Sequence, residues 1–142
     1  MIGYDPDAIV RHYFSDQEGE LFLVSRDDFF VKSVRSVFQK TLGIKEIEVE
    51  QHRNLQSGLR SILDRTRNGV AVMVMVERYL EKVSSADFVR ALSGAAPSAK
   101  IMCLTDEAER GVSAFMHELG AGSILTKPAS ANDIIAKTAG LV

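Results

Sequence analysis

The sequence has one cysteine, no surplus of basic residues and no long apolar run, and each of these absences excludes a class of protein. A single cysteine, Cys103, cannot form an internal disulfide, which favours a reducing compartment. A net charge of -2 gives no reason to expect direct binding to nucleic acid. No apolar stretch approaches the roughly 20 residues of a membrane span, and residues 1–20 lack a secretion signal. We therefore expect a cytoplasmic protein that binds neither a membrane nor nucleic acid.

Two further absences concern chemistry. No glycine-rich phosphate loop follows the first apolar run, so a nucleotide or flavin enzyme would lack its usual anchor. The histidines His12, His52 and His117 are not spaced as metal ligands. There is also no internal repeat or low-complexity linker, and 142 residues fit one domain with one sizeable core.

Short apolar runs alternate with stretches of helical spacing along most of the chain. Strands are predicted at 21–24, 44–49, 70–76, 101–104 and 124–125, and helices at 30–42, 55–63, 88–92, 112–119 and 134–141. This alternation is typical of a parallel sheet covered by helices on both faces. Because crossover connections are right-handed, we expect a doubly wound sheet of five parallel strands in the order 2-1-3-4-5.

A helical segment is predicted ahead of this pattern. Asp5 is suited to cap a helix with Pro6 at its first position, and four apolar residues within 9–14 give that helix an apolar side. We therefore divide the chain into an N-terminal helical extension, 1–19, and a domain, 20–142. The extension suits packing against the domain, and it equally suits contact with a partner or a second copy.

Polar side chains stand where the predicted strands end. They are Ser25, Arg26, Asp27 and Asp28 after the first strand, Glu77 after the third, Thr105 and Asp106 after the fourth, and Lys127 with Pro128 after the fifth. Parallel strands deliver their carboxyl ends to one crevice, so we expect these groups to meet there. Glu77 is the most informative, because it closes an apolar run that is typical of a central strand buried on both faces.

With this layout, residues 20–142 resemble a response-regulator receiver domain, the phosphate-accepting module of two-component signalling, which has a flavodoxin-like fold. The spacing of Glu77, Thr105, the Gly-Ala pair at 120–121 and Lys127-Pro128 carries the resemblance. In that family an acidic pair and an aspartate hold Mg²⁺, and the aspartate accepts the phosphoryl group. A Thr or Ser and a Lys bind the phosphoryl oxygens, which are the roles implied for Thr105 and Lys127.

The sequence departs from the receiver pattern around the acceptor. Counting back from residues 86–90, which match the pattern without a gap, the acceptor position falls on Glu77 instead of an aspartate. The loop 78–81 lacks the proline usual in the family, and Asp106 replaces a small residue. Ile124 stands where receivers often carry a switching Tyr or Phe.

The expected metal site is altered too. Ser25 and Arg26 occupy the positions of the acidic pair, and Asp27 and Asp28 follow one position late. Mg²⁺ prefers oxygen ligands, and a guanidinium about 4 Å away would repel even a unit charge by roughly 4 kcal/mol at an effective dielectric of about 20. A longer nucleophile without its metal loses most of the available acceleration. We therefore expect Glu77 to be a fixed charge that is not phosphorylated.

Several alternative functions are compatible with this pattern of residues. We favour an atypical receiver without enzyme activity, cofactor or metal, in which Glu77, flanked by Lys127, is a built-in negative charge. Arg26 either flanks Glu77 as a second cation or points outward into solvent. A strand-end carboxylate paired with Lys127 and without a signalling role is the structural alternative. In a third interpretation, a one-residue slip lets Asp27 and Asp28 bind Mg²⁺ in a working phosphoacceptor, whereas helix capping is their structural role. A small-molecule enzyme on the same fold is the weakest alternative.

The expected partners are other signalling proteins, among them a histidine kinase or a fused effector domain. The surface of the predicted fourth helix, fifth strand and fifth helix is where we expect them to bind. A homodimer stays open. Both a free-standing regulator and the front part of a longer protein fit this sequence.

Overall fold

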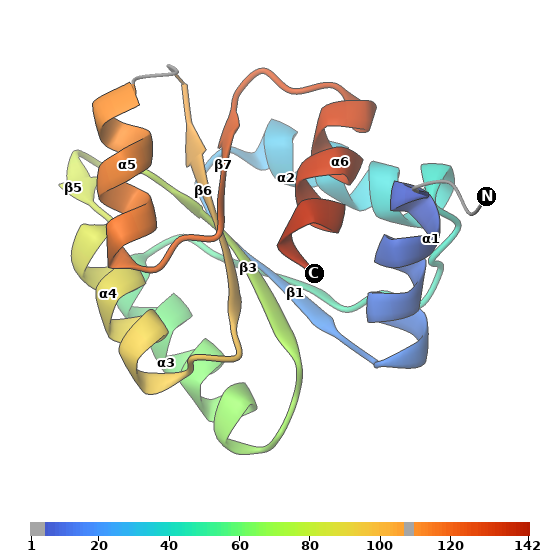
Figure 1. Ribbon diagram of the computed structural model, residues 1–142, viewed down its shortest axis with the longest axis horizontal. Coiled ribbons are helices and arrows are strands. Elements are labelled where there is room, and N and C mark those ends of the chain that lie inside the picture. Colours follow the sequence, from blue (N-terminus) through green and yellow to red (C-terminus); the bar gives the residue numbers. More distant parts are fainter. Residues whose placement is uncertain (1–4, 107–109) are drawn as a thin grey trace.

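The computed structural model describes residues 5–106 and 110–142, and a sheet forms its central layer (Figure 1). The strands of this sheet are β1 (Glu20–Val24), β2 (Val49–His52), β3 (Val72–Glu77), β6 (Lys100–Thr105) and β7 (Ser123–Thr126). All neighbouring strands are parallel and lie in the order β2-β1-β3-β6-β7. The predicted doubly wound order 2-1-3-4-5 is therefore confirmed, because β6 and β7 are the fourth and fifth strands of the sheet.

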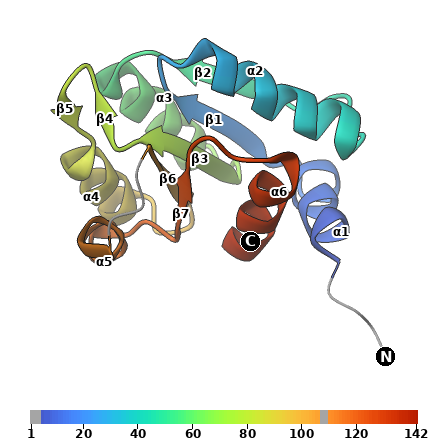
Figure 2. The ribbon, with the colours of Figure 1, turned by 90° about the horizontal axis from the view of Figure 1, so that it is seen from above.

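Helices cover both faces of the sheet, as Figure 2 shows from above. One face is covered by α1 (Pro6–Arg11), the π-helix η1 (His12–Asp16), α2 (Asp28–Ser36), the π-helix η2 (Val37–Thr41) and α6 (Ala131–Leu141). The other is covered by α3 (Leu55–Arg67), α4 (Ala86–Ala95) and α5 (Arg110–Leu119). Within the described ranges, no helix has both the length and the apolar character needed to cross a membrane.

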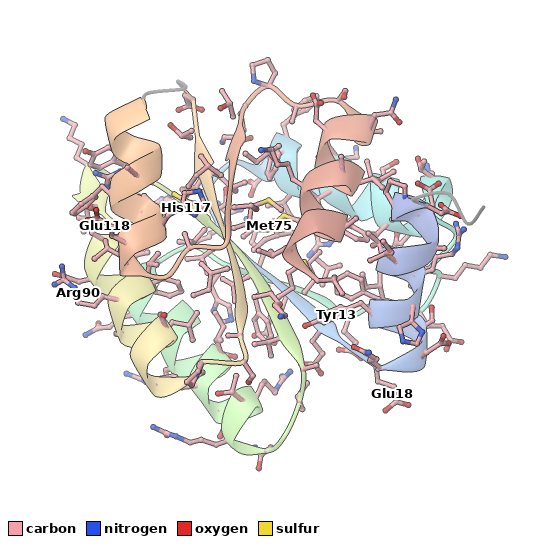
Figure 3. All side chains as sticks on the ribbon, viewed as in Figure 1. Tyr13, Glu18, Met75, Arg90, His117 and Glu118 are labelled. Carbon is pink, nitrogen blue, oxygen red and sulfur yellow. The ribbon has the colours of Figure 1, made fainter. Side chains whose placement is uncertain are left out.

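The side chains of β3 alternate between two cores. Met73 and Met75 contribute to the core under α2 and α6, and Figure 3 labels Met75 near the centre of the molecule. Val72, Val74 and Val76 contribute to the core under α3, α4 and α5. Both sets are buried, which explains why the run is apolar without interruption.

The N-terminal extension packs against the domain. Asp5 caps α1 by accepting a hydrogen bond from the Ala8 N–H (3.3 Å). Tyr13 points from the extension toward the sheet (Figure 3), and Phe14 makes edge-on contacts with Tyr13 (4.9 Å between ring centroids) and Phe38 (5.2 Å). Burial raises the pKa of the Tyr13 hydroxyl to about 12. The apolar side predicted for this helix is thus part of the first core.

Two local predictions are wrong. Ile44 and Ile47 do not lie in a strand: they are buried from the turn that precedes β2, which starts only at Val49. An apolar residue in a turn can fill a core as well as one in a strand, so the pattern alone misplaces the strand. The segment read as a loop after β3 is a hairpin of β4 (Tyr79–Leu80) and β5 (Val83–Ser84).

Candidate functional site

The predicted polar residues meet in a crevice at the carboxyl end of the sheet. A hollow of about 320 Å³ is lined there by Arg26, Asp27, Glu77, Tyr79, Leu80, Glu81, Asp106 and Lys127. These residues follow or end strands β1, β3, β6 and β7, or belong to the β4–β5 hairpin. The polar side chains at the carboxyl ends of the strands therefore line the same crevice, as expected for parallel strands.

A larger cleft, of about 640 Å³, lies at the amino end of the sheet. Its lining includes Glu18, Glu20, Glu46 and Glu48. None of the strand-end groups singled out by the sequence lies there, and Glu20 is already paired with Arg65 (2.7 Å). We therefore place the candidate site in the smaller crevice.

Glu77 is the last residue of β3, and it is buried with 8% of its surface exposed. Its Oε2 accepts a hydrogen bond from the Ser25 hydroxyl (2.7 Å) and one from the Lys127 ammonium (2.8 Å). A buried carboxylate is costly unless it is paired and hydrogen-bonded, and both requirements are met here. The structure thus brings together Glu77, Ser25 and Lys127, three of the predicted site residues.

The Lys127 ammonium lies among three carboxylates. Its Nζ is 2.8 Å from Glu77, 2.9 Å from Asp27 and 3.9 Å from Asp106, and it stands 5.2 Å from the centre of the Phe30 ring. Burial alone lowers the pKa of Lys127, but the hydrogen bonds to Glu77 and Asp27 outweigh it, so the pKa lies above its usual value. Lys127 therefore stays charged and pairs with the Glu77 and Asp27 carboxylates.

Asp27 and Asp28 point to different places. Asp27 caps α2 by accepting a hydrogen bond from the Phe30 N–H (3.0 Å), and its other oxygen accepts one from Lys127. The Lys127 hydrogen bond, followed by the backbone bond, holds the pKa of Asp27 below its usual value. Asp28 instead pairs with Arg53 and accepts a hydrogen bond from Gln51 (3.0 Å). Only Asp27 of the two lines the hollow.

The side chains of Ser25 and Arg26 also have different partners. The Ser25 hydroxyl donates to Glu77 and accepts a hydrogen bond from the Asp27 N–H (3.0 Å). Arg26 lines the hollow but pairs with Glu81 on the hairpin, not with Glu77, so the outward alternative for Arg26 holds and the flanking of Glu77 by two cations does not. Arg26 reaches outward because an exposed carboxylate is available at the hairpin turn.

Sequence reasoning missed the hairpin that supplies Glu81. Its turn has positive φ at Glu81 (48°) and Lys82 (69°). Turns with two such residues usually carry Asn, Asp or Gly, and Glu-Lys gives no such signal. The only sequence hint was that the usual proline of the receiver pattern is missing from residues 78–81.

The remaining predicted residues lie at the ends of the last two strands. Thr105 ends β6 half-buried, and its carbonyl accepts a hydrogen bond from the Lys127 N–H (2.7 Å). Ile124, in β7, packs against the second core. The Lys127–Pro128 peptide bond is cis. Asp106 is at the mouth of the hollow with 85% of its side chain exposed.

These groups do not offer Mg²⁺ the ligand set that it prefers. Carboxylates are present, but the Lys127 ammonium lies between Asp27 and Glu77, and a serine stands in place of one acid of the pair. In the described part of the chain, no group of three or more His, Cys, Asp or Glu side chains is placed to hold a metal ion. In place of a metal ion, the Lys127 ammonium pairs with the Asp27 and Glu77 carboxylates.

Comparison with known proteins places the fold. No protein-family model matches the sequence, and no curated protein matches it. The chemotaxis protein CheY4 of Vibrio cholerae is similar with a TM-score of 0.71 at 15% identity, over 87% of this chain and 98% of its own. A response-regulator receiver domain of Clostridium thermocellum has a TM-score of 0.69 at 20% identity, over 87% and 93%. A chain of the CheX-CheY complex of Borrelia burgdorferi reaches 0.71 at 13%, over 83% and 84%. At these identities the similarity shows the receiver fold and no more.

Proposed function

We propose that this chain is an atypical receiver domain, which works as a protein-interaction module without the metal-dependent phosphoryl cycle. The observation that carries the proposal is the position of the Lys127 ammonium, 2.8 Å from Glu77 and 2.9 Å from Asp27. An internal cation already balances the carboxylates that a metal ion would otherwise bind.

Electrostatics favours this interpretation over metal binding. A divalent ion about 4 Å from the Lys127 ammonium would be repelled by about 8 kcal/mol at an effective dielectric of about 20. Moving the ammonium away would leave Glu77 buried without its counter-charge. The alternative with Asp27 and Asp28 as metal ligands also requires Asp28 to leave Arg53 and Gln51.

The geometry of Glu77 argues against phosphorylation as well. Phosphoryl transfer depends on a positioned nucleophile and on neutralisation of the transferred charge. The Glu77 Oε2 atom accepts hydrogen bonds from Ser25 and Lys127, so lone pairs of that oxygen are engaged. We propose accordingly that the domain catalyses no reaction and that Glu77 is a permanent anion at the position where receivers acquire one.

The proposed partners are other signalling proteins. One similar structure is a chain of a complex between CheX and CheY, so at least one protein with this fold forms such a contact. A histidine kinase, a fused effector domain or a second copy of the chain are the partners that the receiver resemblance suggests. The proposal needs no cofactor.

Incubation with Mg²⁺ and acetyl phosphate tests the proposal. We expect the intact mass to stay unchanged, while an active receiver in the same buffer gains one phosphoryl group. A stoichiometric gain mapped to Glu77, Asp27 or Asp28 would contradict the proposal and favour a working phosphoacceptor. A titration with Mg²⁺ followed by amide NMR is the companion measurement, in which we expect no saturable shift at Asp27 or Glu77.

A further inference from the structure

Large apolar side chains are exposed on the elements that surround the crevice, and Tyr79 among them lines it. We call four of them the crevice rim: Phe29 (82% exposed), Tyr79 (59%), Val83 (57%) and Phe115 (42%). Phe29 lies in the first turn of α2, two positions after the capping residue Asp27, and Tyr79 and Val83 belong to the hairpin. Figure 2 shows α2, the hairpin and α5 around the ends of the strands. Neighbouring exposed apolar groups mark an interaction surface, and Tyr79 and Phe115 are neighbours because both rings lie near the Arg78 guanidinium.

Arg78 connects two parts of this rim. Its guanidinium lies 4.4 Å from the centre of the Tyr79 ring and 5.8 Å from that of Phe115. It also donates a hydrogen bond to the Ser84 hydroxyl (2.6 Å), and the Arg78 N–H donates to the Leu104 carbonyl (2.7 Å). These contacts hold the hairpin against the sheet and α5, so Tyr79 is held in place before any partner arrives.

The hollow inside the rim is negative. Among the described residues, four carboxylates line it, from Asp27, Glu77, Glu81 and Asp106, together with two cations, Arg26 and Lys127. Two positive and four negative charges leave a balance of -2. Lys127 is closer to Glu77 and Asp27 than to Asp106, and the Asp106 side chain is 85% exposed, so its charge is the least compensated.

We infer that this crevice takes a lysine or arginine side chain of a partner protein. The cation lies against Asp106 at the mouth of the hollow, and apolar residues next to it in the partner's sequence contact the crevice rim. A hollow of about 320 Å³ suits one long side chain, since ligand pockets start at roughly 300 Å³. This inference rests on the proposed function, because it names the chemistry of the partner that such a module would bind.

Selection from random peptides displayed on phage tests the inference. The immobilised full chain should enrich peptides with Lys or Arg between apolar residues. The strongest synthetic peptide is then titrated by calorimetry. We expect Asp106→Asn to weaken its binding roughly fivefold, as for an exposed charge pair. Tyr79→Ala should weaken it roughly tenfold or more, as for an aromatic anchor. Both residues are exposed, so both variants should keep the fold, which circular dichroism checks.

Matched variants lie outside the crevice. Asp64→Asn on the exposed face of α3 and Val142→Ala at the end of the chain should leave the affinity unchanged within about twofold. Enrichment of acidic peptides, no enrichment, or equal weakening by the control variants would overturn the inference. Self-association of the wild type that Tyr79→Ala abolishes would also overturn it, because a second copy would then be the occupant. These outcomes are separate from phosphorylation, so each proposal can fail alone.

Discussion

At the scale of single residues, Lys127 determines the charge state of the crevice. Its side chain is 11% exposed, and that of Glu77 is 10% exposed, so the pair is screened little by water. Ser25 supplies the only other hydrogen bond to the Glu77 carboxylate among the contacts described above. A buried pair of this kind makes the two partners depend on each other much more strongly than an exposed one.

We expect Lys127→Met to lower the free energy of unfolding by about 3–5 kcal/mol at neutral pH, because it leaves Glu77 buried without a counter-charge. Urea denaturation followed by circular dichroism measures the change. Lys137→Met, on the exposed side of α6, is the matched control and should stay within about 0.5 kcal/mol of the wild type. A loss below about 1 kcal/mol for Lys127→Met would mean that the pair behaves like an exposed one.

The titration of Asp27 makes the stability of the folded protein depend on pH in the acid range. The pKa of Asp27 is held below its usual value of 3.8, first by the hydrogen bond from Lys127. A depressed pKa contributes stability above the unfolded pKa, and this contribution is lost as the pH falls through the folded pKa. Asp27→Asn keeps a cap for α2 but no longer titrates. Its stability should therefore fall less steeply than that of the wild type between about pH 4 and pH 2.

The comparison needs urea midpoints of both proteins at several pH values in that range. Asp64→Asn, an exposed aspartate on α3, should follow the wild-type curve. Parallel curves for Asp27→Asn and the wild type would show that the Lys127 contact does not shift the titration of Asp27.

At the scale of elements, two parts lie outside the five-stranded sheet and the helices that connect its strands: the N-terminal extension (α1 and η1) and the β4–β5 hairpin. The extension is structural in the described residues, because Val10, Tyr13 and Phe14 are buried in the first core. The hairpin is different: only Leu80 is buried in it, and Tyr79 and Val83 face the solvent. One element thus completes the core, and the other presents side chains to the outside.

Substitution of one buried and one exposed phenylalanine tests whether a side chain stabilises the core or only faces the solvent. We expect Phe14→Ala to lower the free energy of unfolding by about 3–5 kcal/mol, because Phe14 is 5% exposed and packs against Phe38. Phe29→Ala removes the same group from a position that is 82% exposed, and it should change stability by no more than about 0.5 kcal/mol. Urea denaturation measures both. Equal losses would mean that exposure does not separate the two sites.

At the scale of the whole molecule, much of the fold can be predicted from the sequence because burial leaves a periodic pattern. The run 70–76 and the helical stripes predict a doubly wound sheet, and the strand ends then predict that Glu77 and Lys127 meet. The predicted cap and apolar side of the first helix follow from Asp5, Pro6 and the residues within 9–14. These features depend on local periodicity and on where strands end.

What could not be predicted depends on side-chain direction and on turns without a signal. Arg26 pairs with Glu81 because the hairpin brings that carboxylate near. The Glu81-Lys82 turn of this hairpin has none of the Asn, Asp or Gly residues from which a hairpin turn is usually predicted. Asp27 and Asp28 are neighbours in sequence, yet capping sends one to the crevice and the other to Arg53. Such choices among nearby partners are settled in three dimensions.

The contact between Asp27 and Lys127 joins residues that are 100 positions apart, and the Glu77–Lys127 contact spans 50. During synthesis on the ribosome, Glu77 emerges long before the ammonium that neutralises it. In a nascent chain that ends before residue 127, the Glu77 carboxylate at the end of β3 therefore has no counter-charge from Lys127. Pairings between residues far apart in the sequence also form slowly. The Glu77–Lys127 pair at this corner therefore cannot form before residue 127, just after β7, has left the ribosome.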